Sequence, residues 1–154
     1  MIFSSNSTHK IDGKGRVSIP AGFRKVLEQE PQTGVVLAPD VRGDDAIEGF
    51  GYSRLEQMVD AIEEMPPLED ETMALAHALI GEAKHLQLDE NGRIVLSAEI
   101  KAWARLEEQA LFIGLGRRFQ IWNPDIYAER RAAMRDRARA NLHRIPRARP
   151  AEAS

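Results

Sequence analysis

The sequence predicts an α+β fold, mainly β, in which two tandem repeats form one pseudo-two-fold barrel with helices at its periphery. Three observations lead to this prediction. Residues 10–19 match residues 87–96 at an offset of 77. Each copy contains the pattern Asp-x-x-Gly-Arg and then alternates apolar and polar residues, which is the period of a half-buried strand. Apolar residues at helical spacing fill much of the chain that links the two copies.

Each copy begins with a short strand that leads into a tight turn. Asp12 and Asp89 are turn-forming residues whose carboxylates can accept backbone N–H bonds. Gly15 and Gly92 can adopt the positive φ that a hairpin or a bulge needs. After the turn, the alternation directs the apolar residues of the strand to the core and its arginine away from it.

A helix and a further hairpin follow the turn in both copies. Pro20 opens the first helix, because a missing N–H has no cost there, and Ser97 can cap the equivalent helix. The residues expected to face inward from these helices are Phe23, Val26, Leu27, Ile100 and Trp103. Strands are expected over residues 35–38 and 110–114, and the second arms end at Tyr52 and Trp122.

The linking region and the C-terminal region are predicted to be helical. Ser53 caps a helix over 54–65, which Pro66-Pro67 ends. A second helix covers 69–83, with Met73, Ala76, Leu79 and Ile80 inward, and a third begins at Asn123-Pro124 and continues to about residue 141. The expected domains are repeat 1 (6–53), a helical linker (54–79), repeat 2 (80–123), a C-terminal helix (124–142) and a flexible basic tail (143–154).

The formal net charge of −3 conceals an uneven distribution along the 154 residues. Residues 1–24 carry +3, residues 25–85 carry −10, residues 86–128 carry −1 and residues 129–154 carry +5. Such segregation permits local anion binding despite a negative total. Zero cysteines exclude disulfides and thiolate metal sites and favour a cytoplasmic location. The longest apolar stretch, 110–115, is too short to cross a membrane, so no membrane partner is expected.

The motifs resemble one known family. Residues 12–20 (DGKGRVSIP), 88–96 (LDENGRIVL) and 114–122 (GLGRRFQIW) are similar to the MraZ family of bacterial transcription regulators, and the resemblance covers about residues 6–142. It implies two tandem copies of the AbrB-type swapped-hairpin half-barrel, also described as double-psi-like. It also implies ring-like homo-oligomers, associated with the nucleoid, that bind repeated promoter elements upstream of the division and cell-wall genes, including the regulator's own gene. Repression is favoured over activation.

The residues themselves predict how double-stranded DNA would be bound. The turns project Lys14 and Arg16 from one copy and Asn91 and Arg93 from the other. A two-stranded ribbon can enter the major groove, where an arginine can donate two bonds to guanine O6 and N7. Lys10, Lys14, Arg24 and Lys84 are expected to hold phosphates. Asp12 and Asp89, with Gly15 and Gly92, are expected to shape the turns and orient the arginines.

Several alternatives stay open at this point. The motif taken alone is equally consistent with a plain β-turn carrying a solvated arginine. The protein could instead be an antitoxin-like relative whose helices bind a partner enzyme, or a structural ring with no specific DNA target. The arginines at 130, 131, 135, 137 and 139 could contact DNA or form a solvated helix face. No catalytic, metal-binding or cofactor-binding pattern is present in the sequence, so we expect no enzyme, no metal and no cofactor.

Overall fold

The computed structural model describes residues 1–148, which form two compact units. Residues 1–124 make up the first, and the second begins at Asp125. Within residues 1–148 the strands are β1 Asn6–Lys10, β2 Arg16–Ser18, β3 Val35–Pro39, β4 Ala46–Phe50, β5 Lys84–Leu86, β6 Arg93–Val95, β7 Gln109–Gly114 and β8 Phe119–Trp122. The helices are α1 Ala21–Glu28, α2 Tyr52–Glu63, α3 Asp70–Ala76, α4 Ala98–Trp103 and α5 Pro124–Asn141, with a π-helical turn η1 His77–Gly81 and a 3-10 turn η2 Leu142–Arg144.

The large sheet interleaves the two repeats. Its strand order is β1-β7-β8-β4-β3-β5, and every pairing is antiparallel. The first strand of repeat 1, β1, pairs with β7 of repeat 2, and the first strand of repeat 2, β5, pairs with β3 of repeat 1. The order is therefore symmetric about the β8–β4 pair at the centre. Neither repeat completes its part of the sheet without the other.

A separate two-stranded ribbon joins the segments that follow the two turns. β2 pairs with β6, so that Arg16 lies opposite Val95, Val17 opposite Ile94, and Ser18 opposite Arg93. Val17 and Ile94 are fully buried in the core. Successive residues of a strand point to opposite faces, so the residues on either side of Val17 and Ile94 point away from the core.

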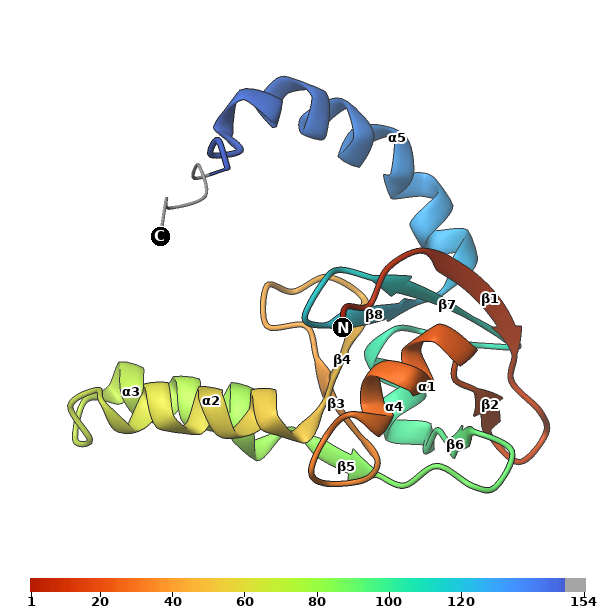
Figure 1. The fold of residues 1–154 in the computed structure, drawn as a ribbon, viewed down its shortest axis with the longest axis horizontal. Helices are drawn as coiled ribbons and strands as arrows, with labels where there is room; N and C mark the ends of the chain where they lie inside the picture. Colours follow the sequence, from red (N-terminus) through yellow and green to blue (C-terminus); the bar gives the residue numbers. More distant parts are fainter. Residues whose placement is uncertain (149–154) are drawn as a thin grey trace, which may run out of the picture. The chain divides into compact units, whose positions relative to one another are not determined.

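The hydrophobic core lies between the large sheet, the ribbon and the helices α1 and α4 (Figure 1). Four phenylalanine rings form its centre, with Phe3, Phe23 and Phe119 in mutual contact at centroid distances of 5.1 to 5.3 Å. Phe112 packs on the same cluster. The helix residues predicted to face inward do so: Phe23, Leu27 and Ile100 are buried, and Val26 and Trp103 pack against the core.

The α+β class, with an antiparallel sheet and several helices, is confirmed. The sheet is not closed, because within the described residues β1 and β5 stand at its two edges. A swapped-hairpin barrel of the AbrB type is therefore not confirmed by the strand pairings. The ribbon β2–β6 remains a second, separate sheet rather than joining these edges.

The start of α2 differs from the prediction. Tyr52 does not end a strand but begins the helix, and Ser53 lies inside the first turn instead of capping it. The carboxylate of Glu30, which follows the end of α1, accepts bonds from the Ser53 backbone N–H at 3.0 Å and from its hydroxyl at 2.8 Å. A carboxylate at a helix N-terminus satisfies an N–H that the helix itself leaves unpaired. A distant acid thus replaces the local cap.

The predicted helix over 69–83 is present as α3 and η1, and Ala76, Leu79 and Ile80 are partly buried, but the fourth residue predicted to face inward is not. Met73, which was predicted to face inward, is 54% exposed, and Leu75 is also exposed. Within α3 itself, Thr72 is the buried residue, at 6% exposure. Figure 1 shows α2 and α3 lying side by side and extending away from the sheets. A two-helix hairpin has too little neighbouring structure to cover all of its apolar residues.

The second unit consists of α5 and the turn η2. The helix ends at Asn141, as predicted, and every residue over 128–140 is exposed. The tail predicted over 143–154 begins within η2, and its residues 149–154 lie outside the described part of the chain. Among residues 1–148, no helix combines the length and the apolar character that crossing a bilayer demands.

Candidate nucleic-acid interface

The first turn is held together by the Asp12 carboxylate. One of its oxygens, Oδ1, accepts from the backbone N–H groups of Lys14 and Arg16, both at 2.9 Å. The other, Oδ2, accepts from Arg16 Nε at 2.7 Å. The backbone closes the same turn with bonds from Asp12 N–H to the Arg16 carbonyl and from Gly15 N–H to the Asp12 carbonyl, both 3.0 Å. The aspartate therefore fixes both the turn and the direction of the arginine.

The second turn repeats this geometry. Asp89 Oδ1 accepts from the N–H groups of Asn91 and Arg93 at 2.8 and 3.0 Å, and Oδ2 accepts from Arg93 Nε at 3.0 Å. Both guanidinium groups are half-buried, with the side chain of Arg16 36% exposed and that of Arg93 30% exposed. The two turns thus place equivalent arginines in equivalent environments.

Each turn also binds the strand that follows the other turn. The Gly15 carbonyl accepts from Leu96 N–H at 2.7 Å, and the Gly92 carbonyl accepts from Ile19 N–H at 3.0 Å. Both glycines have positive φ, +80° and +74°, a region that residues with a Cβ rarely occupy. Because the ribbon is antiparallel, the two turns lie at its opposite ends.

The outer face of the β2–β6 ribbon carries four side chains: Arg16, Ser18, Arg93 and Val95. Val95 is 56% exposed. The motifs alone do not mark it as part of the site. Its position, two residues after Arg93 in an alternating strand, indicates that it shares the outer face with that arginine.

The other predicted cations lie in different settings. Lys10 ends β1 and Lys14 lies within the first turn, and both are exposed. Arg24, from α1 of repeat 1, donates from Nη1 to the Asn91 carbonyl at 3.2 Å, so it lies against the second turn. The Lys84 Nζ lies 3.9 Å from a carboxylate oxygen of Glu99. Arg24 is therefore bonded to the second turn, although it lies 67 residues before Asn91 in the sequence.

The pKa values of the two turn aspartates reflect these bonds. The pKa of Asp12 falls to about 2, chiefly because its carboxylate accepts the backbone N–H of Arg16, and then because it accepts the Arg16 side chain. The pKa of Asp89 is lowered for the same leading reason, the backbone N–H of Arg93. Both aspartates are consequently ionised at neutral pH and keep the arginines in place.

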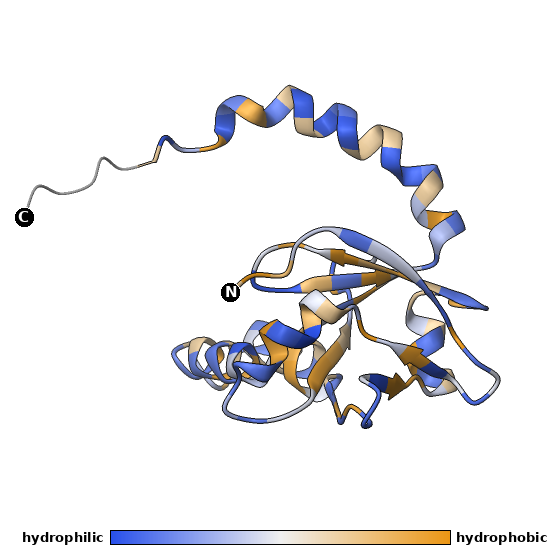
Figure 2. Ribbon diagram, turned by 45° about the vertical axis from the view of Figure 1, so that its right-hand side comes forward, coloured by the Kyte–Doolittle hydropathy of each residue, from blue (hydrophilic) through white to orange (hydrophobic). Residues whose placement is uncertain are grey.

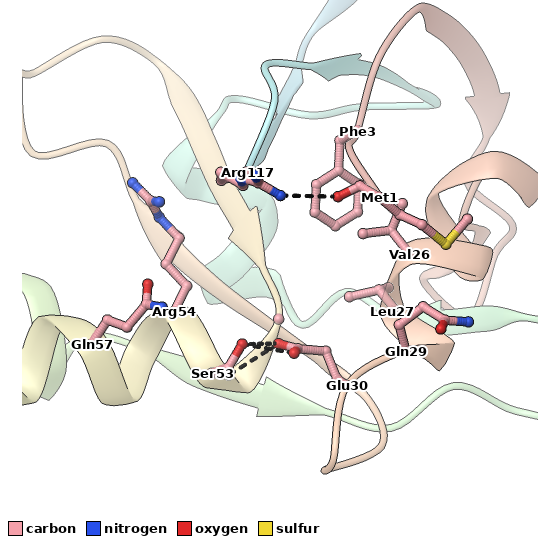
Figure 3. A pocket seen from close by; sticks show the side chains of 11 residues that line it. Met1, Phe3, Val26, Leu27, Gln29, Glu30, Ser53, Arg54, Gln57 and Arg117 are labelled. Carbon is pink, nitrogen blue, oxygen red and sulfur yellow. Dashed lines mark hydrogen bonds between the residues drawn. The ribbon is translucent and has the colours of Figure 1, made fainter. Parts of the chain in front are cut away.

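A pocket of about 450 Å³ lies elsewhere, between the N-terminal segment, α1 and α2 (Figure 3). Its acid, Glu30, is bound to Ser53 at the start of α2, and Arg117 Nη1 donates to the Met1 carbonyl at 3.4 Å. No histidine or lysine lines this pocket. Its contacts secure the first turn of α2 and do not assemble an acid–base pair. Within residues 1–148, no three His, Cys, Asp or Glu side chains are grouped to hold a metal ion.

The fold and the paired turns define a class of protein: a tandem-repeat α+β chain whose two halves exchange strands and jointly present an arginine-bearing ribbon. Known proteins are similar to this chain in sequence. The family model MraZ, described as "MraZ protein, putative antitoxin-like", matches residues 79–143. A "Transcriptional regulator MraZ" from Gluconobacter oxydans is 39% identical over 141 residues, which cover 90% of this chain and 85% of the relative.

Further relatives carry the same name. The protein from Xanthobacter autotrophicus is 42% identical over 124 residues, which cover 80% of this chain and 78% of the relative. The protein from Rhodospirillum rubrum is 40% identical over 124 residues, covering 79% of each. The chain therefore belongs to the MraZ family, and the resemblance found in its motifs is confirmed.

Proposed function

We propose that this chain is a transcriptional regulator that binds double-stranded DNA sequence-specifically through the outer face of the β2–β6 ribbon. The observation that carries the proposal is the pair of aspartate-braced arginines, Arg16 and Arg93, on one face of the ribbon. The relatives named transcriptional regulators support the same assignment. A ribbon of two strands fits the major groove.

The bracing suits base recognition. Each aspartate takes the Nε of its arginine, which leaves the two Nη groups as the donors for guanine O6 and N7. Arg16 and Arg93 are diagonal neighbours across the ribbon, and residues in that relation are roughly 7–8 Å apart. That spacing is about two base-pair steps of DNA. Val95 can contact a thymine methyl group, and Ser18 can bond to either kind of base edge.

The surrounding cations would set the position on the duplex. Lys10 and Lys14 flank the first turn, and Arg24 lies against the second. Contacts from such residues to phosphates fix register and orientation without reading sequence. Asn91, at the second turn, would add a neutral hydrogen-bonding group.

The same proposal includes assembly and target. One ribbon face is small, so useful affinity requires several copies on successive sites, and linked sites can gain roughly 10²–10⁴ in avidity. We therefore propose a ring-like homo-oligomer at the nucleoid that binds repeated promoter elements of the division and cell-wall gene cluster, its own gene included, as a repressor. The exchanged pairings β1–β7 and β5–β3 support a swapped-hairpin relation between repeats 6–53 and 80–123.

The test is operator binding by Arg16→Ala and Arg93→Ala, measured by fluorescence anisotropy on a duplex carrying the promoter repeats and on a scrambled duplex. Each variant should lose about 1–3 kcal/mol of discrimination between the two duplexes and keep its oligomeric mass. Arg42→Ala, an exposed arginine in the β3–β4 loop, is the matched control and should bind as the parent does. Parent-like discrimination by both ribbon variants would disprove the proposal.

A second candidate is an antitoxin-like role in which the helices bind a partner enzyme. The antitoxin-like description of the matching family and the exposed Met73 and Leu75 on α3 favour it. Co-purification of a nuclease with the parent chain, lost in Met73→Lys and unaffected by Arg16→Ala, would support this role. The absence of any such partner, together with specific DNA binding, would reject it.

A further inference from the structure

The loop between β3 and β4 and the helical segment α3–η1 enclose an apolar groove of about 700 Å³. Val41, Met73, Ala74 and Ala78 supply apolar lining, and the carboxylates of Asp70 and Glu82 belong to the same lining. Val41 and Met73 are 55% and 54% exposed. A groove of this kind, apolar and bordered by acids, suits a basic segment that also carries an apolar residue.

The helical hairpin that forms this groove is strongly acidic. Residues 52–82 contain eight acidic side chains and one arginine, a net charge of −7. Its burial is also inverted, because Thr72 is buried whereas Met73 and Leu75 of the same helix are exposed. Apolar residues left outside while a polar one is inside are typical of a surface that a partner covers.

The second unit has the complementary character. Residues 125–148 contain seven arginines and three acids, a net charge of +4. Figure 2 shows strongly hydrophilic residues alternating with apolar ones, mostly alanines, along α5. A helix with no buried face over 128–140 gains nothing from packing within its own unit. We therefore expect α5 to be stabilised by packing against a partner.

The arginines are not spread evenly around α5. At 100° per residue, Arg131, Arg137 and Ala138 lie beside Met134, because they are three or four residues from it. Glu129 and Asp136 lie on the opposite side of the helix. The helix consequently has one face on which arginines flank an exposed methionine, while Glu129 and Asp136 lie on the opposite face together with Arg139.

We propose that the Met134 face of α5 from one copy docks in the Asp70–Glu82 groove of a second copy, head to tail. This inference rests on the ring-like assembly proposed above. A ring of identical subunits needs two different and complementary surfaces on each copy, and the groove and the helix supply them. Met134 would enter among Val41, Met73 and Ala78, while Arg131 and Arg137 would pair with Asp70 and Glu82.

Cysteine cross-linking tests the proposal directly, because the parent chain has no cysteine. Met73→Cys is mixed with an affinity-tagged Met134→Cys chain in the absence of DNA, oxidised, captured by the tag and separated on a non-reducing gel. We expect a disulfide-linked dimer of the two different chains. Ala132→Cys, on the opposite side of α5, replaces Met134→Cys as the control and should give at most a tenth of that yield.

Two outcomes would overturn the proposal. The first is equal yields with Met134→Cys and Ala132→Cys in the mixing experiment. The second comes from a single chain that carries both Met73→Cys and Met134→Cys, oxidised in the absence of DNA: a disulfide that forms only within that chain would place the helix in the groove of its own copy. Because DNA is absent, both outcomes are independent of operator binding and hence of the proposed regulatory function.

Charge-reversal variants test whether α5 binds the groove of a second copy or binds DNA. Arg131→Glu with Arg137→Glu should reduce the mass of the assembly in solution, and adding Asp70→Lys with Glu82→Lys to the same chain should restore it. Arg135→Glu with Arg139→Glu makes the same charge change off the Met134 face and should leave the mass unchanged. Loss of DNA binding with an unchanged mass in the first variant would overturn the proposal and assign the helix to DNA.

Discussion

The two turns share one backbone and differ in the chemistry that they carry. Over 10–16 the first turn has three basic residues and one acid, whereas over 87–93 the second has one basic residue and two acids. Asn91 stands where the first copy has Lys14, and Val95 where it has Ser18. The second turn gains a cation from outside, because Arg24 of repeat 1 bonds to the Asn91 carbonyl. Duplication has kept the geometry and diversified the surface.

This comparison suggests a division of labour. In the proposed binding to DNA, the first turn would supply its own positive charge, and the second would depend on Arg24 from a helix of the other repeat. The bonds that hold the backbone are conserved between the two halves of the chain, from the Asp-to-Nε contact to the crossed glycine carbonyls. The buried differences, such as Val17 against Ile94, exchange one apolar residue for another, whereas the changes of charge and polarity lie on exposed side chains such as Lys14 and Asn91.

The largest expected difference between the turns concerns their glycines. A Cβ at Gly15 would lie 2.6 Å from the Leu96 carbonyl oxygen, which is fixed backbone, whereas a Cβ at Gly92 would meet the Arg24 side chain, which can move. Gly15→Ala should therefore lower the free energy of unfolding by about 3 kcal/mol and Gly92→Ala by about 1 kcal/mol. Urea denaturation of both variants measures this, and equal losses would mean that the turns are equally rigid.

A smaller difference is expected in the salt dependence of DNA binding. Lys14→Asn should remove one phosphate contact and decrease the magnitude of the salt slope by about 0.9, equally for operator and scrambled duplexes. Asn91→Lys should increase it by a similar amount, because it gives the second turn the charge of the first. A changed base preference in the Lys14 variant would instead make that lysine a base-reading residue.

The smallest expected difference concerns the low pH at which each turn loses the stabilising contribution of its aspartate. Both aspartates have lowered pKa values, so the stability that they give their turns is present above the ordinary carboxyl pKa near 3.8 and is lost as the pH falls through the folded value. For Asp12 the loss should occur between about pH 4 and pH 2. Carboxyl carbon shifts in an NMR titration test this, with Asp12→Asn as the assignment control. A midpoint near 3.8 for Asp12 would show that its bonds to Arg16 are not kept in solution.

The local features of the fold could be predicted from the sequence. The strand after each turn, the helix that Ser97 caps through a 3.2 Å bond to Ile100 N–H, and the end of α5 all depend on residues within a few positions of one another. Short-range patterns determine such features because the competing conformations are also local.

The remaining features depend on contacts between distant residues. The cap that Glu30 provides for α2, the contact of Arg24 with the second turn, and the exposure of Met73 are properties of packing. A helical period says which residues share a face but does not say whether another element covers that face. The motifs in the sequence predict the two arginines of the candidate site. They do not predict Val95, because its place on the outer face becomes clear only from its pairing with the opposite strand.

The pairing of β1 with β7 has a consequence for the nascent chain. Asn6 pairs with Ile113, so more than a hundred further residues must be synthesised before the partner of the first strand exists. Contacts of such long sequence separation slow folding, and an unpaired strand edge can pair with other chains during the delay. Thr8 and Lys10, both exposed, make the early strand polar on one side. Their polarity would keep it soluble on the ribosome until repeat 2 emerges.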